Sequence, residues 1–189
     1  NKFQIFFTVI STFIFHPIKC YNYIYLEKAS RRYWIVALKH LIINSHILRK
    51  SLDWIHFEFA TTSIGRENVA RAMDAKSAVS FRGFDIGLYP HQHPGCYNLL
   101  WEKIDKVHTI SDDLYQQALA IGLDPNIPSQ KITPAIDTKL FSSEKKSGLH
   151  DPLRILTVGR LTWKKGFEYF LKSLELLKKD GIKFECKIV

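Results

Sequence analysis

The sequence predicts an α/β protein built on parallel sheets. From residue 51 onward, short apolar segments of strand length alternate with longer segments of helical periodicity, and glycine or proline marks most junctions between them. Of the 189 residues, 46% are hydrophobic and 13% aromatic, which excludes intrinsic disorder because that much apolar surface is not left in water. Strands that alternate with helices favour a parallel sheet with helices packed on its faces.

The first segment, Phe3 to Phe15, is apolar but short. Its 13 residues fall below the roughly 20 that a helix needs to cross a bilayer. The basic n-region and the small-residue cleavage site of a signal peptide are both missing. We therefore expect a buried helix that ends at His16-Pro17, rather than a membrane anchor.

Residues 28–50 combine positive charge with helical periodicity. One expected helical face is apolar, because large apolar residues recur at spacings of three and four. Two interpretations stay open: a helix packed on a sheet with a solvated basic face, or a basic amphipathic helix on an anionic membrane surface. The cations are Lys28, Arg31, Arg32, Lys39, Arg49 and Lys50, and the apolar residues are Trp34, Ile35, Leu38, Leu41, Ile42 and Leu48.

Residues 51–123 carry the first strand–helix repeat. Ser111 is expected to cap the third helix, whose first turn contains Asp112 and Asp113, and Gly122 is expected to stop it. The turn Arg82-Gly83-Phe84-Asp85 follows the second strand. The predicted strands are 54–59, 78–81 and 106–110, and the predicted helices are about 63–73, 97–104 and 111–120.

A second unit is expected after a linker. Residues 124–152 contain four prolines and few apolar residues, which is typical of connecting chain. The strand 154–158, a helix at about 166–179 and the strand 184–189 then form a βαβ unit, whose two strands we predict to be parallel neighbours. Because the chain begins with Asn1 and ends on a strand, we expect it to be part of a longer protein.

The strongest chemical signal is VGRLTWKKG, residues 158–166. A strand ends at Gly159, and Arg160 and Lys165 then lie on either side of a short loop that leads into a helix. Free N–H groups and partial positive charge at a helix N-terminus attract phosphate, and both cations suit a diphosphate. Neither GxGxxG nor a P-loop is present, so the alternative is a solvated basic turn.

Two runs of sequence carry a resemblance to a known family. They are ISDDLYQQALAIGLDPNIPSQKITPAIDTKLF and RILTVGRLTWKKGFEYFLKSLELL. In this order they resemble glycosyltransferase family four, the retaining nucleotide-sugar glycosyltransferases of the GT-B fold, over roughly residues 51–189. The resemblance implies two Rossmann-like domains, of which the second is present only as its first βαβ unit.

The resemblance also implies domain roles and site residues. It implies an acceptor-side domain at 1–141, a linker at 142–152 and the start of the nucleotide-sugar domain at 153–189. Arg160 and Lys165 match the pair that grips the donor diphosphate, and the chemistry needs no metal or other cofactor. The partners would be a nucleotide sugar and a glycan or lipid-linked acceptor. The candidate cleft residues are Arg82, Gly83, Asp85 and Gly159.

This sequence departs from the family pattern at three places. Arg82 stands where the family often has a histidine that approaches the donor sugar, and Ala135 replaces an interdomain glycine. A pair of glutamates eight residues apart, which holds the donor, would lie beyond Val189. The second hypothesis is therefore an accessory phosphate- or lipid-binding module of the same fold, without activity.

The net charge and the cysteine content limit the binding partners and the cellular compartment that we expect for this protein. The net charge of +9 favours polyanions, but no nucleic-acid-binding motif is present, so we expect a phosphorylated ligand or an anionic membrane surface rather than nucleic acid. The segment HQHPGC, residues 91–96, does not have the spacing of a zinc site. Three widely separated cysteines favour a reducing, cytoplasmic compartment, with membrane association as an added expectation.

Overall fold

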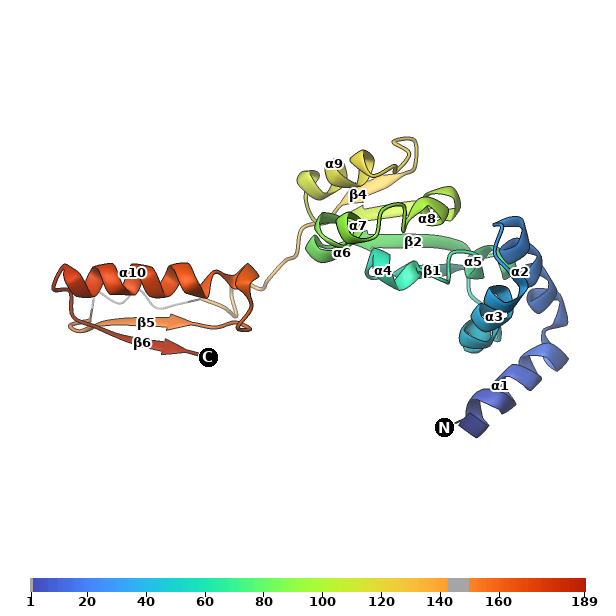
Figure 1. Ribbon diagram of the computed structural model, residues 1–189, viewed down its shortest axis with the longest axis horizontal. Helices are drawn as coiled ribbons and strands as arrows, with labels where there is room; N and C mark the ends of the chain where they lie inside the picture. Colours follow the sequence, from blue (N-terminus) through green and yellow to red (C-terminus); the bar gives the residue numbers. More distant parts are fainter. Residues whose placement is uncertain (1, 143–149) are drawn as a thin grey trace. The chain divides into compact units, whose positions relative to one another are not determined.

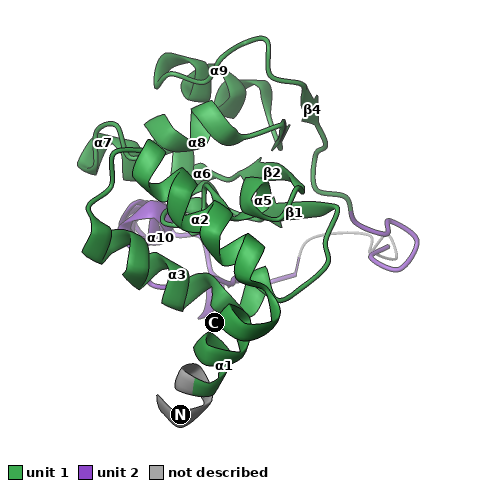
Figure 2. Cartoon of the chain, turned by 90° about the vertical axis from the view of Figure 1, so that its right-hand side faces the viewer, with its two compact units in different colours: residues 1–135 green, residues 136–189 purple. Residues whose placement is uncertain are grey.

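The computed structural model describes residues 2–142 and 150–189, and the chain divides into two compact units. Unit 1 comprises residues 1–135 and unit 2 comprises residues 136–189 (Figure 2). Most of the predicted linker, at 143–149, lies outside the described residues. The two units are therefore described separately.

Unit 1 contains a four-stranded parallel sheet in the order β1-β2-β3-β4 (Figure 1). Val79 of β2 lies opposite both Phe57 of β1 and Val107 of β3. The predicted α/β class and parallel sheet are confirmed, whereas β4 falls in a stretch from which we expected no strand. The strands are β1 (Trp54–Phe57), β2 (Lys76–Phe81), β3 (Lys106–Thr109) and β4 (Ser129–Lys131).

Short helices connect these strands. Ser111 caps α9 as predicted, because its Oγ accepts a hydrogen bond from the Leu114 N–H at 3.3 Å. The single helix predicted over 63–73 is instead two short helices, separated by a segment in which Gly65 has a φ of 78°. The helices are α4 (Ala60–Ser63), α5 (Val69–Ala72), α6 (Gly83–Gly87), α7 (Tyr89–Gln92), α8 (Asn98–Lys103) and α9 (Asp112–Ala120).

The main core lies on one face of this sheet. Parallel strands that follow one another in sequence order are joined by right-handed crossovers, which place the connecting helices on the same face. Odd-numbered strand residues accordingly point toward those helices: Phe57, Val79, Phe81 and Val107 are all buried in one cluster with Trp101 of α8. Even-numbered strand residues point to the opposite face.

Three helices precede the sheet: α1 (Lys2–Phe15), α2 (Pro17–Ala29) and α3 (Trp34–Leu48). The prediction of a helix at 3–15 is confirmed, but the prediction that it is buried is wrong. Between residues 7 and 15 the buried side chains are Ser11 and Thr12, while Phe13 and Phe15 are exposed. Among the described residues, no helix has both the length and the apolar character needed to cross a membrane.

The structure divides the six apolar residues that were predicted to share one helical face. Leu41 and Leu48 are buried, whereas the other four, all in α3, are exposed. The inward face also carries Asn44 and Ser45, and it packs on α1, α2 and α5. Arg31, with a φ of 59°, lies in the break between α2 and α3 and divides the expected basic segment.

A buried polar network holds this helical layer together. Glu27 is completely buried, and its carboxylate accepts bonds from Arg32 Nη1 at 2.8 and 3.0 Å and from Asn68 Nδ2 at 2.8 Å. His40 Nδ1 lies 2.9 Å from the same carboxylate, and Arg32 Nη2 also pairs with Glu67 at 3.0 Å. These contacts join α2 and α3 to the segment that leads into α5.

Unit 2 is a βαβ unit. β5 (Leu153–Thr157) and β6 (Phe184–Ile188) pair in parallel, and α10 (Phe167–Lys179) connects them. The prediction of parallel neighbours is confirmed, with strand bounds within one residue of those expected. Leu174 of α10 is buried, whereas Leu171 and Leu176 of the same helix are exposed.

Candidate functional site

The basic loop of unit 2 lies at the carboxyl end of β5, where α/β proteins bind ligands. Gly159 extends the pairing of the two strands, because its N–H donates to the Val189 carbonyl at 2.9 Å. A Cβ placed on Gly159 would lie 3.9 Å from Cδ of Lys165, so the lysine stem runs past this glycine. The structure therefore brings Gly159 and Lys165 together.

Lys165 ends a 3₁₀ turn, Trp163–Lys165, that leads into α10 through Gly166. Gly166 has a φ of 68°, a left-handed conformation that glycine adopts without strain. Arg160 and Lys165 are exposed, and neither pairs with an acidic side chain in the described parts of the chain. Two available cations and the N-terminus of a 13-residue helix make this loop suitable for an anion.

In unit 1, Asp85 joins two loops at the carboxyl ends of β1 and β2. Its side chain is completely buried, and its carboxylate accepts from the N–H groups of Ala60 and Arg82, each at 2.8 Å. Burial raises the pKa of the Asp85 carboxyl above its ordinary value, while these backbone hydrogen bonds oppose the rise. Asp85 thus supports the candidate cleft loop, and its carboxylate does not face solvent.

Replacing Asp85 with alanine is expected to destabilise unit 1 by about 1–3 kcal/mol, because two backbone N–H groups lose their acceptor and Ala60 is buried. Chemical denaturation followed by circular dichroism would measure the loss. Glu102→Ala, at an exposed position of α8, is the control and should change stability by less than about 0.5 kcal/mol. Equal, small changes in the two variants would contradict this role for Asp85.

Arg82 and Gly83 belong to the same turn as Asp85 and lie at its surface. Gly83 is exposed and begins α6. Arg82 is partly exposed; its Nη2 lies 3.3 Å from Oε2 of Glu58, and its guanidinium lies 6.0 Å from the centre of the Phe59 ring. The positive charge of Arg82 is therefore held against the end of β1 by a solvent-exposed ion pair.

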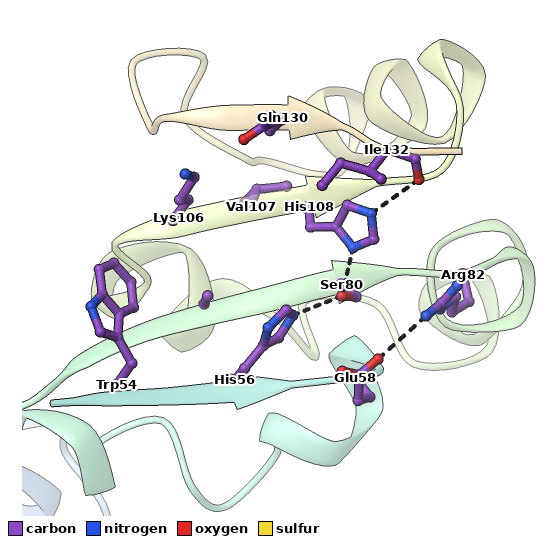
Figure 3. A pocket seen from close by; sticks show the side chains of 11 residues that line it. Trp54, His56, Glu58, Ser80, Arg82, Lys106, Val107, His108, Gln130 and Ile132 are labelled. Carbon is purple, nitrogen blue, oxygen red and sulfur yellow. Dashed lines mark hydrogen bonds and ion pairs between the residues drawn. The ribbon is translucent and has the colours of Figure 1, made fainter. Parts of the chain in front are cut away.

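The open face of the unit 1 sheet forms a cavity of about 530 Å³. Most of its lining comes from even-numbered residues of the strands and from residues just beyond them, together with Val107 of β3. Glu58 and Arg82 lie at one end (Figure 3). Trp54 lines the opposite end, beside the start of β1 (Figure 3).

A chain of hydrogen bonds crosses this face from β1 to the end of β4 (Figure 3). His56 Nε2 lies 2.7 Å from Ser80 Oγ, which lies 2.8 Å from His108 Nδ1, and His108 Nε2 lies 3.1 Å from the Ile132 carbonyl oxygen. A carbonyl only accepts, so His108 Nε2 carries the hydrogen. In neutral His108, Nδ1 then accepts from the Ser80 hydroxyl, which in turn accepts from His56 Nε2.

His56 and Glu58 lie two residues apart in the predicted strand 54–59, so strand alternation places them on one face of it. Ser80 and His108 were not among the candidate site residues. Strand alternation could have found them, because both occupy even positions in predicted strands. The missing information was the strand register, in which Ser80 lies opposite His108 and His56 lies opposite Ala78, two residues before Ser80. Register depends on the packing of the opposite face.

No group of three or more His, Cys, Asp or Glu side chains in the described residues could hold a metal ion. In the histidine-rich segment, the His93 ring stacks on Tyr89 with the ring centres 4.2 Å apart.

Two curated proteins are similar to this chain over 140 residues, which is 71% of the chain and 33% of each relative. The amylovoran biosynthesis glycosyltransferase AmsK of Erwinia amylovora is 29% identical, and the putative colanic acid biosynthesis glycosyltransferase WcaL of Escherichia coli K12 is 28% identical. The chain spans about a third of the length of these relatives. No family model matches it. The chain is thus distantly related to glycosyltransferases of polysaccharide biosynthesis.

Proposed function

We propose that this chain is part of a retaining GT-B glycosyltransferase that moves a sugar from a nucleotide sugar to a glycan or lipid-linked acceptor. The observation that carries the proposal is the distant relation to two glycosyltransferases of polysaccharide biosynthesis. Parallel sheets in both units agree with the Rossmann-like domains of such an enzyme. Residues 1–141 would belong to the acceptor side, 142–152 to the linker, and 153–189 to the start of the donor domain.

Arg160 and Lys165 are the proposed diphosphate-binding residues. Transfer of the sugar leaves a nucleoside diphosphate, whose negative charge grows as the glycosidic bond breaks. Fixed positive groups that face this charge stabilise the transition state more than the ground state. The Lys165 ammonium, the Arg160 guanidinium and the N–H groups at the start of α10 supply such charge.

The turn Arg82-Gly83-Phe84-Asp85 is the proposed contribution of unit 1 to the cleft. Gly83 offers an exposed backbone beside the Arg82 guanidinium, while the buried carboxylate of Asp85 fixes the turn. Three cysteines without disulfides agree with a cytoplasmic location, which we include in the proposal.

The second candidate is an accessory module that binds a phosphorylated ligand or a lipid without catalysing transfer. The observation in its favour is Arg82, whose side chain is paired with Glu58 at the position where the family often has a histidine. Such a module would use the same basic loop of unit 2.

Activity measurements distinguish the two candidates. We expect the protein in its full natural length to bind nucleotide sugars and to form a product with the donor's anomeric configuration, as observed by NMR. We expect residues 1–189 alone to transfer no sugar, because they hold only one βαβ unit of the donor domain. Nucleotide binding without transfer by the full-length protein would favour the accessory module. Transfer by residues 1–189 alone would contradict the proposed domain assignment.

A further inference from the structure

The cavity on the open face of the unit 1 sheet takes no part in the proposed diphosphate site, yet it has the size of a ligand pocket. Its volume of about 530 Å³ falls within the roughly 300–1,000 Å³ of small-molecule sites. Ala78, the smallest residue of its lining, lies opposite His56 of β1 and Lys106 of β3. Longer side chains therefore stand on both sides of a methyl group, and space for a ligand remains between them.

Trp54 provides an aromatic wall at the end of the cavity where the strands begin. Its side chain is 47% exposed. Lys76 lies opposite Trp54 in the pairing of β1 with β2, and its ammonium lies 5.7 Å from the centre of the Trp54 ring. Figure 3 shows Lys106 of β3 at this same end of the cavity. An exposed indole and two ammonium groups thus occur together.

The positive charge at this end is not balanced by a carboxylate. Lys76 and Lys106 are exposed, and neither forms an ion pair with another residue in the described parts of the chain. Asp105, next to Lys106, instead accepts a hydrogen bond from a backbone N–H of β2 at 2.7 Å. Glu58, the one carboxylate of the cavity lining, pairs with Arg82 at the opposite end. A ligand that is complementary to the Trp54 end therefore carries a negative charge.

The floor of the cavity carries groups that bind hydroxyls. Ser80 is only 1% exposed, and its hydroxyl is held between His56 and His108. His56 uses Nε2 in this contact, while its Nδ1 makes no hydrogen bond with another described residue and stays available to a ligand. Gln130 of β4 is exposed, and its carboxamide offers donors and an acceptor. A ligand rich in hydroxyl groups matches this floor.

We propose that this cavity binds a glycan through a sugar that carries a carboxylate, a uronic acid. The apolar face of the sugar ring packs on Trp54, the carboxylate lies between the ammonium groups of Lys76 and Lys106, and ring hydroxyls bond to His56 and Gln130. Each of these contacts uses a group that the described residues leave available.

The position of the cavity gives this site a role in holding the glycan. The carboxylate-binding end lies where β1, β2 and β3 begin, whereas the turn at Arg82 follows the carboxyl end of β2. A nucleotide could meet the same ammonium groups, but the relation to glycosyltransferases of polysaccharide biosynthesis favours a glycan. In that choice of ligand the inference rests on the proposed function.

Calorimetric titration of the full-length protein with oligosaccharides of glucuronic or galacturonic acid tests the proposal. The uncharged probes are the same oligosaccharides after reduction of their carboxylates to alcohols. We expect at least one acidic oligosaccharide to bind at least about tenfold more tightly than its reduced form, because only the acidic form meets both ammonium groups. High salt should narrow the difference.

Two variants and two matched controls locate the site. Lys106→Ala should weaken binding of the acidic oligosaccharide about tenfold and leave the reduced one unchanged, whereas Trp54→Ala should weaken both about three- to tenfold. Lys39→Ala and Trp34→Ala, at exposed positions of α3, should change neither. Thermal unfolding checks that the variants are folded, and if Trp54→Ala is not, Lys106→Ala decides alone.

The proposal is overturned if neither acidic oligosaccharide binds more tightly than its reduced form, or if Lys106→Ala binds it as tightly as Lys39→Ala does. Titration with a nucleoside diphosphate separates this result from the proposed function. Lys106→Ala should keep that binding, and a loss would overturn the proposal because the cavity would then hold a nucleotide. Nucleoside diphosphate binding without glycan binding overturns this proposal alone, whereas glycan binding without nucleoside diphosphate binding supports it and contradicts the proposed function.

Discussion

Replacing Glu27 with alanine is expected to destabilise unit 1 by about 3–5 kcal/mol, because the Arg32 guanidinium, only 19% exposed, loses one of the two buried carboxylates that pair with it and keeps only Glu67. The variant also removes the acceptor for Asn68 and the partner of His40. Denaturant unfolding followed by tryptophan fluorescence would measure the effect.

Glu58→Ala is the matched control for this prediction. It too removes a carboxylate paired with an arginine, Arg82, but Glu58 is 65% exposed. Exposed ion pairs contribute about 0–1 kcal/mol, so this variant should stay close to the parent protein in stability. If both variants lost the same small amount of stability, burial would not govern the contribution of the Glu27 network, and the prediction would fail.

Replacing Lys165 with alanine in the full-length protein is expected to weaken binding of the nucleotide-sugar donor at least tenfold. A charge-assisted hydrogen bond to phosphate contributes roughly 1.5–3 kcal/mol, and about 1.4 kcal/mol corresponds to a factor of ten. Calorimetric titration with the nucleoside diphosphate would measure the change. Folding should be unaffected, because Lys165 is exposed and has no acidic partner among the described side chains.

Lys164 provides the control within the same 3₁₀ turn. It is adjacent, equally charged and exposed, and it is not part of the proposed diphosphate site. Lys164→Ala should therefore alter donor affinity less than about threefold, which is under 1 kcal/mol. Similar small losses in both variants would reject Lys165 as a diphosphate-binding residue and leave the loop as a solvated basic turn.

Local signals in the sequence were sufficient to predict the secondary structure of much of unit 2 and of parts of unit 1. The βαβ unit could be predicted because its strands and helix are adjacent in the chain and have sharp ends, and Asp180 and Gly181 follow directly on α10. The cap at Ser111 was predictable for the same reason, since the hydroxyl and the N–H that it accepts from are three residues apart.

The chain of hydrogen bonds from His56 through Ser80 to His108 could not be predicted from local sequence signals. His56 and Ser80 are 24 residues apart, and Ser80 and His108 are 28 apart, so their contact depends on the register of three strands. No spacing along the chain reports that register. The strand β4 was missed because its three residues are all exposed and polar, and pairing with β3 alone makes them a strand.

By itself, the sequence determined the parallel α/β class, the βαβ unit and a basic loop beside a helix N-terminus, because each depends on short-range patterns of apolar residues, caps and glycines. Only the tertiary structure decided which face of α1 and α3 is buried. Helical periodicity shows that apolar residues share a stripe but not what the stripe contacts. Inside the helical layer, the Glu27–Arg32–Asn68 network and the Thr12–Ser45 contact lie together with buried Leu41 and Leu48. Trp34, Leu38 and Ile42 of α3 remain exposed.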